Sequence, residues 1–213
     1  MPRISLTFDD GPHPIWTPRV LRALRRAETR ATFFVVAPLA RRFPRLISDI
    51  LRYGHGVEFH CTAHVQHTQQ SRKQVEADVR DGLRELHRQG VHPQFWRPPW
   101  GVLAPFTAEI ACAFGLELAL WTEGTCDWRG DPASEMLERV GPKLRPGAIV
   151  LMHDGIGPGA LRSGCGETVA LVGPLVERIR FLGYEPGPLN TTFAAVTFPT
   201  DGVSAEQEGP TET

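Results

Sequence analysis

The sequence has no surplus of charge of either sign. Its 213 residues contain 23 Lys and Arg against 24 Asp and Glu, which leaves a formal net charge of −1. A protein that binds a nucleic-acid backbone neutralises many phosphates with basic side chains, and no such surplus is available here. We therefore expect no nucleic-acid partner.

Long apolar runs are also missing. No segment approaches the roughly 18 to 20 consecutive apolar residues that a membrane-spanning helix needs. The first ten residues, MPRISLTFDD, lack the basic, apolar and small-residue segments of a secretory signal. These features predict a chain without a membrane span and with a cytoplasmic location, although a chain trimmed of a leader would look the same.

Cysteine is scarce. The four cysteines show no C-x-x-C pair or other zinc-finger spacing, and a chain of this length needs no disulfide staples. We expect all four to be reduced thiols. With 41% hydrophobic and 22% charged residues, the composition is that of an ordinary globular protein, which excludes a disordered chain, a collagen and a coiled coil.

What the sequence does contain is an alternation of strands and helices. Apolar segments rich in β-branched or aromatic residues predict seven strands, at residues 4–8, 31–36, 55–59, 95–96, 116–121, 148–152 and 193–198. Amphipathic stretches predict helices at residues 14–26, 38–53 with a break at Pro44, 71–89, 105–114, 132–144 and 167–181. This order predicts a parallel α/β fold, either an open sheet or a barrel. The acidic tail at residues 199–213 is predicted to be disordered.

Side chains that can carry chemistry follow the predicted strands, where parallel α/β folds place their sites. Asp9 and Asp10 end the first strand, and the repulsion between their charges must be offset by a cation or by a proton. His60 and His64 are four residues apart, and on one helical turn such a pair points the same way and can bind one ion. Two histidines and one carboxylate would leave metal positions open for water and substrate. His67 can replace either histidine.

Three later strand ends add polar groups. Arg97-Pro98-Pro99-Trp100-Gly101 follows the fourth predicted strand, where the prolines restrict the backbone near the arginine. Asp127-Trp128 follows the fifth strand, and His153 ends the sixth.

These residues resemble, in order and spacing, the five motifs of the polysaccharide deacetylases, which form carbohydrate esterase family 4 and share the NodB-homology domain. The matching segments are Thr7-Phe8-Asp9-Asp10-Gly11-Pro12, His60-x-x-x-His64, Arg97-Pro98-Pro99-Trp100-Gly101, Asp127-Trp128 and Leu151-Met152-His153. The resemblance covers residues 4–198. It implies a distorted (β/α) barrel with about seven strands and one deacetylase domain over residues 1–198.

The resemblance also implies a role for each matching position. Asp10, His60 and His64 are implied to be the metal ligands. Asp9 is implied to be the general base and His153 the general acid.

Further residues are implied to support this set. Arg97 holds Asp9 ionised, and Asp127 orients and tunes His153; both belong to the predicted catalytic set. Trp128 and Leu151 look like the walls of a pocket for the acyl methyl group. The predicted substrate-binding residues are Pro99, Trp100, Trp128, Leu151 and Arg162.

The implied reaction is the metal-dependent hydrolysis of an N-acyl group, expected to be N-acetyl, on an amino sugar or polysaccharide. An amide is a poor electrophile, so the metal polarises its carbonyl and lowers the pKa of a water molecule, while a base takes that water's proton. Backbone N–H groups near Trp100 can share the stabilisation of the oxyanion. We expect zinc, and the ligand set also suits Co²⁺, Ni²⁺, Mn²⁺ and Fe²⁺.

Some positions depart from the family pattern. Cys61 stands where the family usually has Ser or Thr, and its weaker hydrogen bond is expected to orient the next loop less firmly. Coordination of the metal by the Cys61 thiolate is an alternative. Gly124 replaces a frequent acidic or amide residue, and Trp100 replaces a frequent Tyr. Because no core catalytic group is missing, we expect activity on an altered substrate.

The loop at residues 154–167 contains five glycines. It is either a plain connection or a mobile wall of the active site. In the second case Arg162, and with it Cys165, reaches the substrate, and the arginine suits a phosphate or carboxylate group.

Three alternative functions stay open. The first is an amidase or deacylase of a non-sugar or lipid-linked metabolite, which the lack of a leader and the 8% aromatic content favour over a long glycan. The second is an O-deacetylase, because an ester needs the same activation of water. The third is a catalytically silent carbohydrate-binding relative, which predicts the loss of a catalytic residue. The sequence predicts no oligomeric state.

Overall fold

The computed structural model of the protein describes residues 1–190. The strand expected at residues 193–198, the domain boundary at residue 198 and the tail expected at 199–213 lie outside them. Among the helices of residues 1–190, none has the length and apolar character that crossing a membrane requires.

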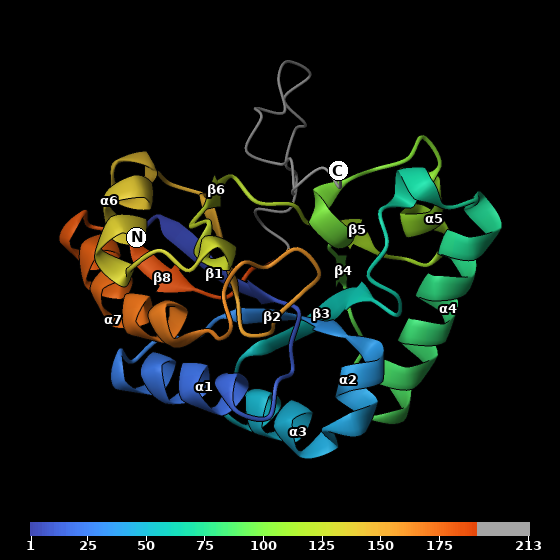
Figure 1. Ribbon diagram of the computed structural model, residues 1–213, viewed down its shortest axis with the longest axis horizontal. Helices are drawn as coiled ribbons and strands as arrows, with labels where there is room; N and C mark the ends of the chain where they lie inside the picture. The colour runs from blue at the N-terminus through green and yellow to red at the C-terminus, as the bar shows by residue number, and fades with distance from the viewer. Residues whose placement is uncertain (191–213) are drawn as a thin grey trace.

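One parallel sheet forms the framework of the fold (Figure 1). Its strands run in the order β5-β4-β3-β2-β1-β7-β6, β8 pairs with the first residues of β1, and every pairing is parallel. The strands are β1 (Arg3–Asp9), β2 (Thr32–Val36), β3 (Gly56–Cys61), β4 (Phe95–Trp96), β5 (Glu117–Leu118), β6 (Glu123–Gly124), β7 (Ile149–His153) and β8 (Glu185–Gly187).

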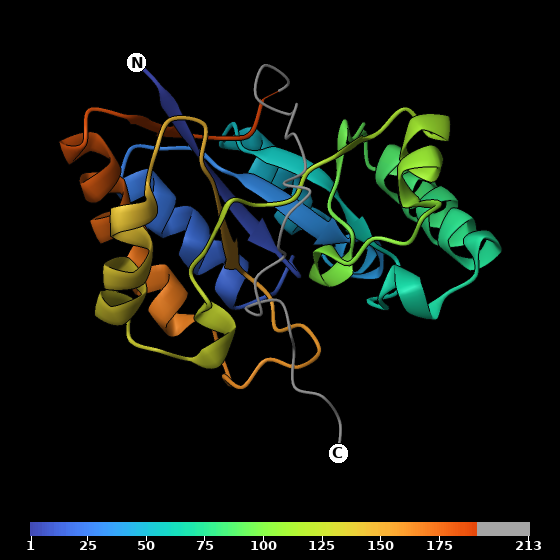
Figure 2. The same cartoon turned by 90° about the horizontal axis from the view of Figure 1, so that it is seen from above.

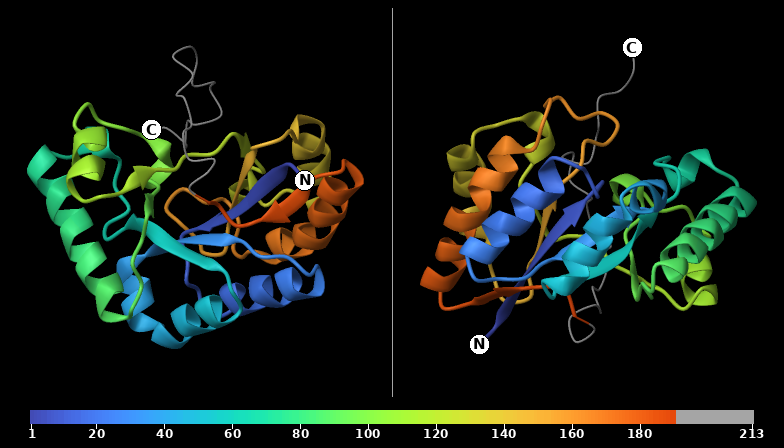
Figure 3. Two further views of the ribbon diagram at one scale, coloured as in Figure 1. Left: turned by 180° about the vertical axis from the view of Figure 1, so that it is seen from behind. Right: turned by 90° about the horizontal axis from the view of Figure 1, so that it is seen from below.

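Helices cover the outside of this curled sheet, as Figures 1 and 3 show. The α-helices are α1 (Trp16–Arg26), α2 (Ala37–Arg42), α3 (Pro44–Arg52), α4 (Arg72–Arg88), α5 (Thr107–Ala113), α6 (Ala133–Val140) and α7 (Gly166–Phe181). Short 3₁₀ helices are η1 (His67–Gln69), η2 (Pro99–Gly101), η3 (Asp127–Arg129) and η4 (Gly141–Lys143).

Local sequence signals set several helix ends. The helix expected at residues 38–53 breaks at Phe43, and Pro44 begins α3, as predicted, because proline lacks the N–H that a continuous helix needs. At the start of α4, Ser71 Oγ accepts a hydrogen bond from the backbone N–H of Gln74, and Gln74 Oε1 accepts from the backbone N–H of Ser71. This confirms the predicted capping box.

Alternation along the strands separates two clusters of apolar side chains. In β1, Ile4, Leu6 and Phe8 are buried in the main core between the sheet and the helices, so Ser5, Thr7 and Asp9 face the inside of the curl. A second, smaller cluster fills part of that inside, and it consists of Phe34, Phe95, Ala119, Ile149 and Leu189 with Trp121 packed against them. The inner face of β1 therefore carries polar side chains, and the second apolar cluster lies beside them.

The barrel stays open between β5 and β6, which are the two ends of the strand order. The chain crosses this opening within a few residues (Figure 2). The backbone N–H of Ala119 donates to the Trp96 carbonyl at 2.9 Å, and that of Thr122 donates to the Ile149 carbonyl at 3.0 Å. The strand expected at residues 116–121 is therefore cut to β5, since the chain must leave β4 to reach β7.

The predicted fold class, a distorted (β/α) barrel, is confirmed. Over residues 1–190 the sheet has eight strands, and the sequence analysis missed β6 and β8. Both are two or three residues long and contain Gly or Pro, so neither carries an apolar pattern that a sequence window detects.

Candidate active site

Three side chains from the ends of β1 and β3, which lie on either side of β2 in the sheet, meet in one cluster. Asp10 follows β1 with a left-handed backbone (φ 69°), His60 lies in β3, and His64 lies in the loop after β3. The Nε2 atoms of His60 and His64 are 3.4 and 3.2 Å from Oδ1 of Asp10. One ligand atom from each residue lies within 4.8 Å of the others, so a single ion can contact all three.

The two histidines do not share a helical turn, and that part of the sequence prediction is wrong. The loop after β3 turns back and places His64 beside His60. Hydrogen bonds to Asp78, a residue of α4, hold this turn. The backbone N–H groups of Thr62 and Ala63 donate to the Asp78 carboxylate at 3.0 and 2.6 Å, and Thr62 Oγ1 donates to the Asp78 carbonyl at 2.7 Å. Asp78 escaped the sequence analysis because nothing in its own helix distinguishes it from a solvated acidic residue.

The cluster fits a divalent metal. Oδ1 of Asp10 is buried and has no hydrogen-bond partner within residues 1–190. Nδ1–H of His60 donates to the backbone carbonyl of Arg97 at 2.6 Å, which leaves Nε2 to face Asp10. Burial raises the pKa of Asp10, but His60 and His64 lower it well below its usual value. A cation among these atoms would satisfy the orphaned oxygen, and two imidazoles with one carboxylate suit zinc and its neighbours in the series.

Neither alternative ligand lies in the cluster. Nδ1 of His67 is 3.0 Å from Thr107 Oγ1, and its ring packs 5.0 Å from the Trp96 ring. Cys61 follows His60 in the same strand, so its side chain faces the helices rather than the inside of the curl. Burial, with nearby carboxylates, raises the pKa of the Cys61 thiol well above its usual value, which disfavours the thiolate.

Asp9 is held on the inner face by a buried arginine. Nη1 of Arg97 donates to Asp9 Oδ1 at 2.8 Å and to Thr7 Oγ1 at 2.9 Å. The same guanidinium donates to the carbonyls of Ala119 and Leu120, in the segment that crosses the open side of the barrel. Arg97 therefore fixes one Asp9 oxygen and connects Asp9 to the segment that crosses the open side of the barrel.

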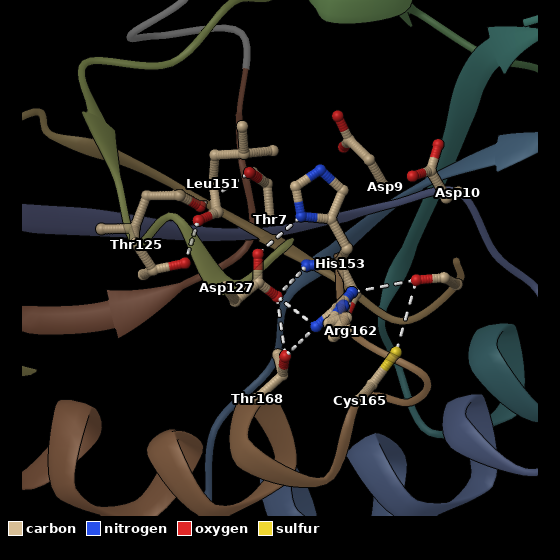
Figure 4. Close-up of polar contacts among 12 residues, drawn as sticks. Thr7, Asp9, Asp10, Thr125, Asp127, Leu151, His153, Arg162, Cys165 and Thr168 are labelled. Carbon is tan, nitrogen blue, oxygen red and sulfur yellow. Dashed lines mark hydrogen bonds and ion pairs between the residues drawn. The ribbon is translucent and has the colours of Figure 1, made fainter. Parts of the chain in front are cut away.

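His153 lies opposite Asp9, because the register of β1 and β7 pairs these two residues. Nδ1 of His153 is 2.7 Å from Oδ1 of Asp127, and the backbone N–H of His153 donates to Oδ2 at 2.9 Å (Figure 4). Burial lowers the pKa of His153, but Asp127 raises it more, with help from Asp10 and Asp9, to about 9. The imidazole is therefore protonated at neutral pH.

The second oxygen of Asp127 accepts further hydrogen bonds. Arg162 Nη1 donates to it at 3.0 Å and Thr168 Oγ1 at 2.7 Å. Burial raises the pKa of Asp127, but His153, Arg162 and Thr168 together bring it down to about 2. The Arg162 guanidinium thus points at Asp127, whereas the sequence analysis expected it to meet an anionic group of the substrate.

One pocket joins these groups, and its walls are partly aromatic. Trp100, with a left-handed backbone (φ 54°), stands edge-on to His64 with ring centroids 4.1 Å apart. Predicted Pro99 is buried and does not line the pocket, while Trp121, which the sequence analysis left out, does. The lining residues are Asp9, Asp10, His60, His64, Trp100, Trp121, Trp128, Leu151, His153, Gly157, Pro158, Gly159, Ala160 and Arg162.

Comparison with known proteins gives one consistent result. The polysaccharide deacetylase family model matches residues 1–119. A peptidoglycan-N-acetylglucosamine deacetylase of Bacillus cereus is 32% identical over 183 residues, which cover 85% of this chain and 83% of the relative. A chitooligosaccharide deacetylase of Sinorhizobium fredii is 31% identical over 189 residues, covering 86% and 88%.

The fold agrees with a solved structure as well. The crystal structure of a peptidoglycan N-acetylglucosamine deacetylase superposes with a TM-score of 0.83 at 25% identity, covering 90% of this chain and 87% of that one. The chain therefore belongs to the polysaccharide deacetylase family, whose members are hydrolases that cleave the N-acetyl amide bonds of sugars.

Proposed function

We propose that the protein removes the acetyl group from N-acetylglucosamine units of a glycan. The observation that carries this proposal is the register of β1 and β7, which sets Asp9 and His153 side by side next to the Asp10, His60 and His64 cluster. A base and an acid then flank the place where a carbonyl would sit. The two curated relatives are named for peptidoglycan N-acetylglucosamine and for chitooligosaccharides, and both names support this substrate class.

The metal site is part of the proposal. A divalent metal held by Asp10, His60 and His64, expected to be zinc with Co²⁺, Ni²⁺, Mn²⁺ or Fe²⁺ as alternatives, supplies a Lewis acid that polarises the acyl carbonyl and acidifies a water molecule.

Asp9 acts as the general base and accepts a proton from the attacking water. Its ion pair with Arg97, at 2.8 Å, fixes one of its two oxygens. The other oxygen is left to receive the proton. Arg97 has no exposed surface and does not line the pocket, so it acts through Asp9.

His153 acts as the general acid. As the C–N bond breaks, its imidazolium gives the proton to the departing amine nitrogen, which would otherwise leave as an amide anion. The bond to Asp127 holds the proton-bearing Nδ1 and directs Nε2 outward into the pocket. The products are acetate and the free amino sugar.

The pocket walls suit a small acyl group. Leu151, Trp128 and Trp121 supply apolar surface beside the catalytic groups, and an acetyl methyl group gains by leaving water there. Backbone N–H groups of the turn around Trp100 are proposed to donate to the developing oxyanion.

Metal analysis and acetate release test the proposal together. The wild type is expected to contain one divalent metal per chain and to release acetate from N-acetylglucosamine oligomers, and Asp10→Ala is expected to lose both. His64→Ala should also lose the metal, while His67→Ala should keep it, because His67 faces Thr107. Metal without acetate release would overturn the substrate class, and no metal in the wild type under any loading condition would overturn the mechanism.

The cytoplasmic location expected from the sequence is likewise a proposal. Fractionation of cells that produce the full natural gene product, followed by immunodetection, tests it directly; recovery outside the cytoplasm would contradict it.

A further inference from the structure

Arg162 is a buried cation in the glycine-rich loop after β7. Its side chain is 4% exposed. Its Nη1 lies between two acceptors, Asp127 Oδ2 at 3.0 Å and Thr168 Oγ1 at 2.6 Å (Figure 4). A buried guanidinium without a carboxylate partner would be costly, so its position is decided by Asp127 rather than by solvent.

The same guanidinium also holds the backbone of its own loop. Nη2 donates to the carbonyls of Gly155 and His153, at 3.0 and 3.4 Å. The backbone N–H groups of Leu161 and Arg162 donate to the Trp128 carbonyl at 2.9 and 3.3 Å. The loop, the acid His153 and the carboxylate that orients His153 are therefore connected through one side chain.

Thr168, in the first turn of α7, supports the same oxygen. It is fully buried, and its hydroxyl donates to Asp127 Oδ2 at 2.7 Å. With the backbone N–H of His153, three donors converge on that oxygen, which leaves Oδ1 for the His153 ring. A carboxylate with three donors on one oxygen is fixed in rotation, because turning it breaks all of them.

We propose that Arg162, assisted by Thr168, is a positioning residue of the reaction: it fixes the Asp127 carboxylate against His153 and neutralises part of its charge. The role rests on the proposed function of His153 as the general acid. It replaces the expected contact with a substrate anion, since the two Nη atoms of Arg162 are both bound to the protein.

Charge sharing has a functional consequence. His153 faces three carboxylates: Asp127 from η3, and Asp10 and Asp9 from β1 and its end. Carboxylates around an imidazolium make it a weaker acid, and a weak acid protonates the leaving amine less readily. Arg162 opposes this by drawing on the same Asp127 charge. Without Arg162, the imidazolium should hold its proton more tightly.

The test compares five variants by three measurements. Arg162→Gln removes the charge and Thr168→Val removes the hydroxyl, while Thr168→Ser restores it. Arg22→Gln is the matched control, because it removes one exposed arginine from the outer face of α1. The imidazole pKa of His153 is followed by NMR, and kcat and KM are measured against pH with N-acetylglucosamine oligomers.

In Arg162→Gln the His153 pKa is expected to rise by about one unit, and kcat near neutral pH to fall roughly tenfold with KM little changed. Thr168→Val should change the His153 pKa and kcat in the same directions, but by less. Thr168→Ser and Arg22→Gln should match the wild type. Two controls separate this effect from misfolding. Arg162→Lys keeps the positive charge and loses the planar, forked set of guanidinium donors. The melting temperature of each variant reports whether it is folded.

An unchanged His153 pKa in Arg162→Gln and Thr168→Val would overturn the proposal. A rise in KM with kcat and pKa unchanged would also overturn it, in favour of a substrate contact. The NMR measurement needs no turnover. If the wild type releases no acetate while the His153 pKa still responds to Arg162, the deacetylase proposal fails and the positioning of Asp127 stands.

Discussion

At the scale of single residues, unusual backbone conformations gather at the site. Four non-glycine residues within residues 1–190 have a left-handed backbone, and three of them, Asp10, Trp100 and Cys126, lie in the pocket or directly before Asp127. Such conformations cost of order 1 to 3 kcal/mol each for ordinary residues, and they persist where the surroundings hold them. Here they orient the metal ligand Asp10, the pocket wall Trp100 and, through Cys126, the carboxylate of Asp127 that contacts His153.

One glycine of the loop after β7 is expected to control the metal ligand. A Cβ atom on Gly157 would overlap the carboxylate of Asp10, while the Gly157 backbone lies outside the left-handed region that only glycine tolerates well. Gly157→Ala should therefore push the Asp10 side chain out of the cluster and leave the fold intact. We expect a metal affinity at least tenfold lower by isothermal titration calorimetry, in line with the effect of residues that orient a ligand.

Gly166 provides the matched control in the same loop region. A Cβ atom there meets no atom within 4 Å, and α7 begins at this residue. Gly166→Ala should bind metal as the wild type does. Equal affinities of the Gly157→Ala variant and the wild type would show that the loop does not constrain Asp10.

The role of His153 as the general acid predicts where activity is lost on the alkaline side of the pH profile. His153 must carry a proton to donate it, so activity is lost as pH rises through its pKa, which the surrounding carboxylates raise to about 9. A bound cation at Asp10 offsets one of these contributions, and the limb should fall below that value. In Asp127→Asn the limb should move to lower pH, because the main charge that raises the pKa of His153 is gone. The value of kcat should drop, because the carboxylate that orients the imidazole through Nδ1 is gone as well. An alkaline limb that is identical in Asp127→Asn and the wild type would contradict the assignment of His153.

At the scale of elements, helix α4 does two separable things. Its capping box closes its own N-terminus, and Asp78 on its second turn fixes the loop that carries His64. One helix therefore contributes both to the free energy of unfolding and to the geometry of the metal ligands.

Ser71→Ala tests the first contribution. Removing the capping hydroxyl should lower the free energy of unfolding by about 1 kcal/mol in urea titrations. Metal content and kcat should stay at wild-type levels, because Ser71 is exposed and its hydroxyl bonds to Gln74 within the capping box. A loss of metal in this variant would mean that the helix start and the site are coupled.

Asp78→Ala tests the second contribution. Two backbone N–H groups of the His64 loop lose their acceptor, so the loop should sample other conformations and the metal affinity should fall about 10- to 100-fold. Calorimetric titration with Zn²⁺ on both variants makes the comparison. The prediction fails if Asp78→Ala binds Zn²⁺ as tightly as Ser71→Ala does.

At the scale of the whole molecule, the site occupies the end of an incompletely closed barrel. β5 and β6 are not paired with each other among residues 1–190, and the chain between them is held by the buried guanidinium of Arg97. That arginine also holds Asp9. The side on which the barrel stays open is therefore linked to the base by one residue, which explains why a fully buried charge is present there.

Metal binding should stabilise the whole fold, because the ligands come from strands that are far apart in sequence. At a free metal concentration of about 100 times Kd, binding adds about 2.7 kcal/mol to the free energy of unfolding. For a domain of this size that corresponds to an increase of roughly 5 to 11 °C in Tm. Scanning calorimetry with Zn²⁺ and with EDTA measures it. His67→Ala should respond like the wild type, and a response retained in Asp10→Ala would contradict the ligand set.

The amino-acid sequence by itself determined the outer architecture. Periodicity placed the strands and helices of the main core, Ser71 and Pro44 marked helix boundaries correctly, and strand-end polar residues indicated where chemistry collects. These features depend on neighbours along the chain, so a window of sequence contains their cause.

The tertiary structure alone decided how the site is held together. It set Asp78 against the His64 loop, bonded Arg162 to Asp127, buried Pro99 and brought Trp121 into the pocket. It also formed β6 and β8, whose few residues pair only because longer strands lie beside them. Each of these depends on contacts between residues distant in sequence, and the register of a sheet, rather than the pattern of any one segment, fixes those contacts.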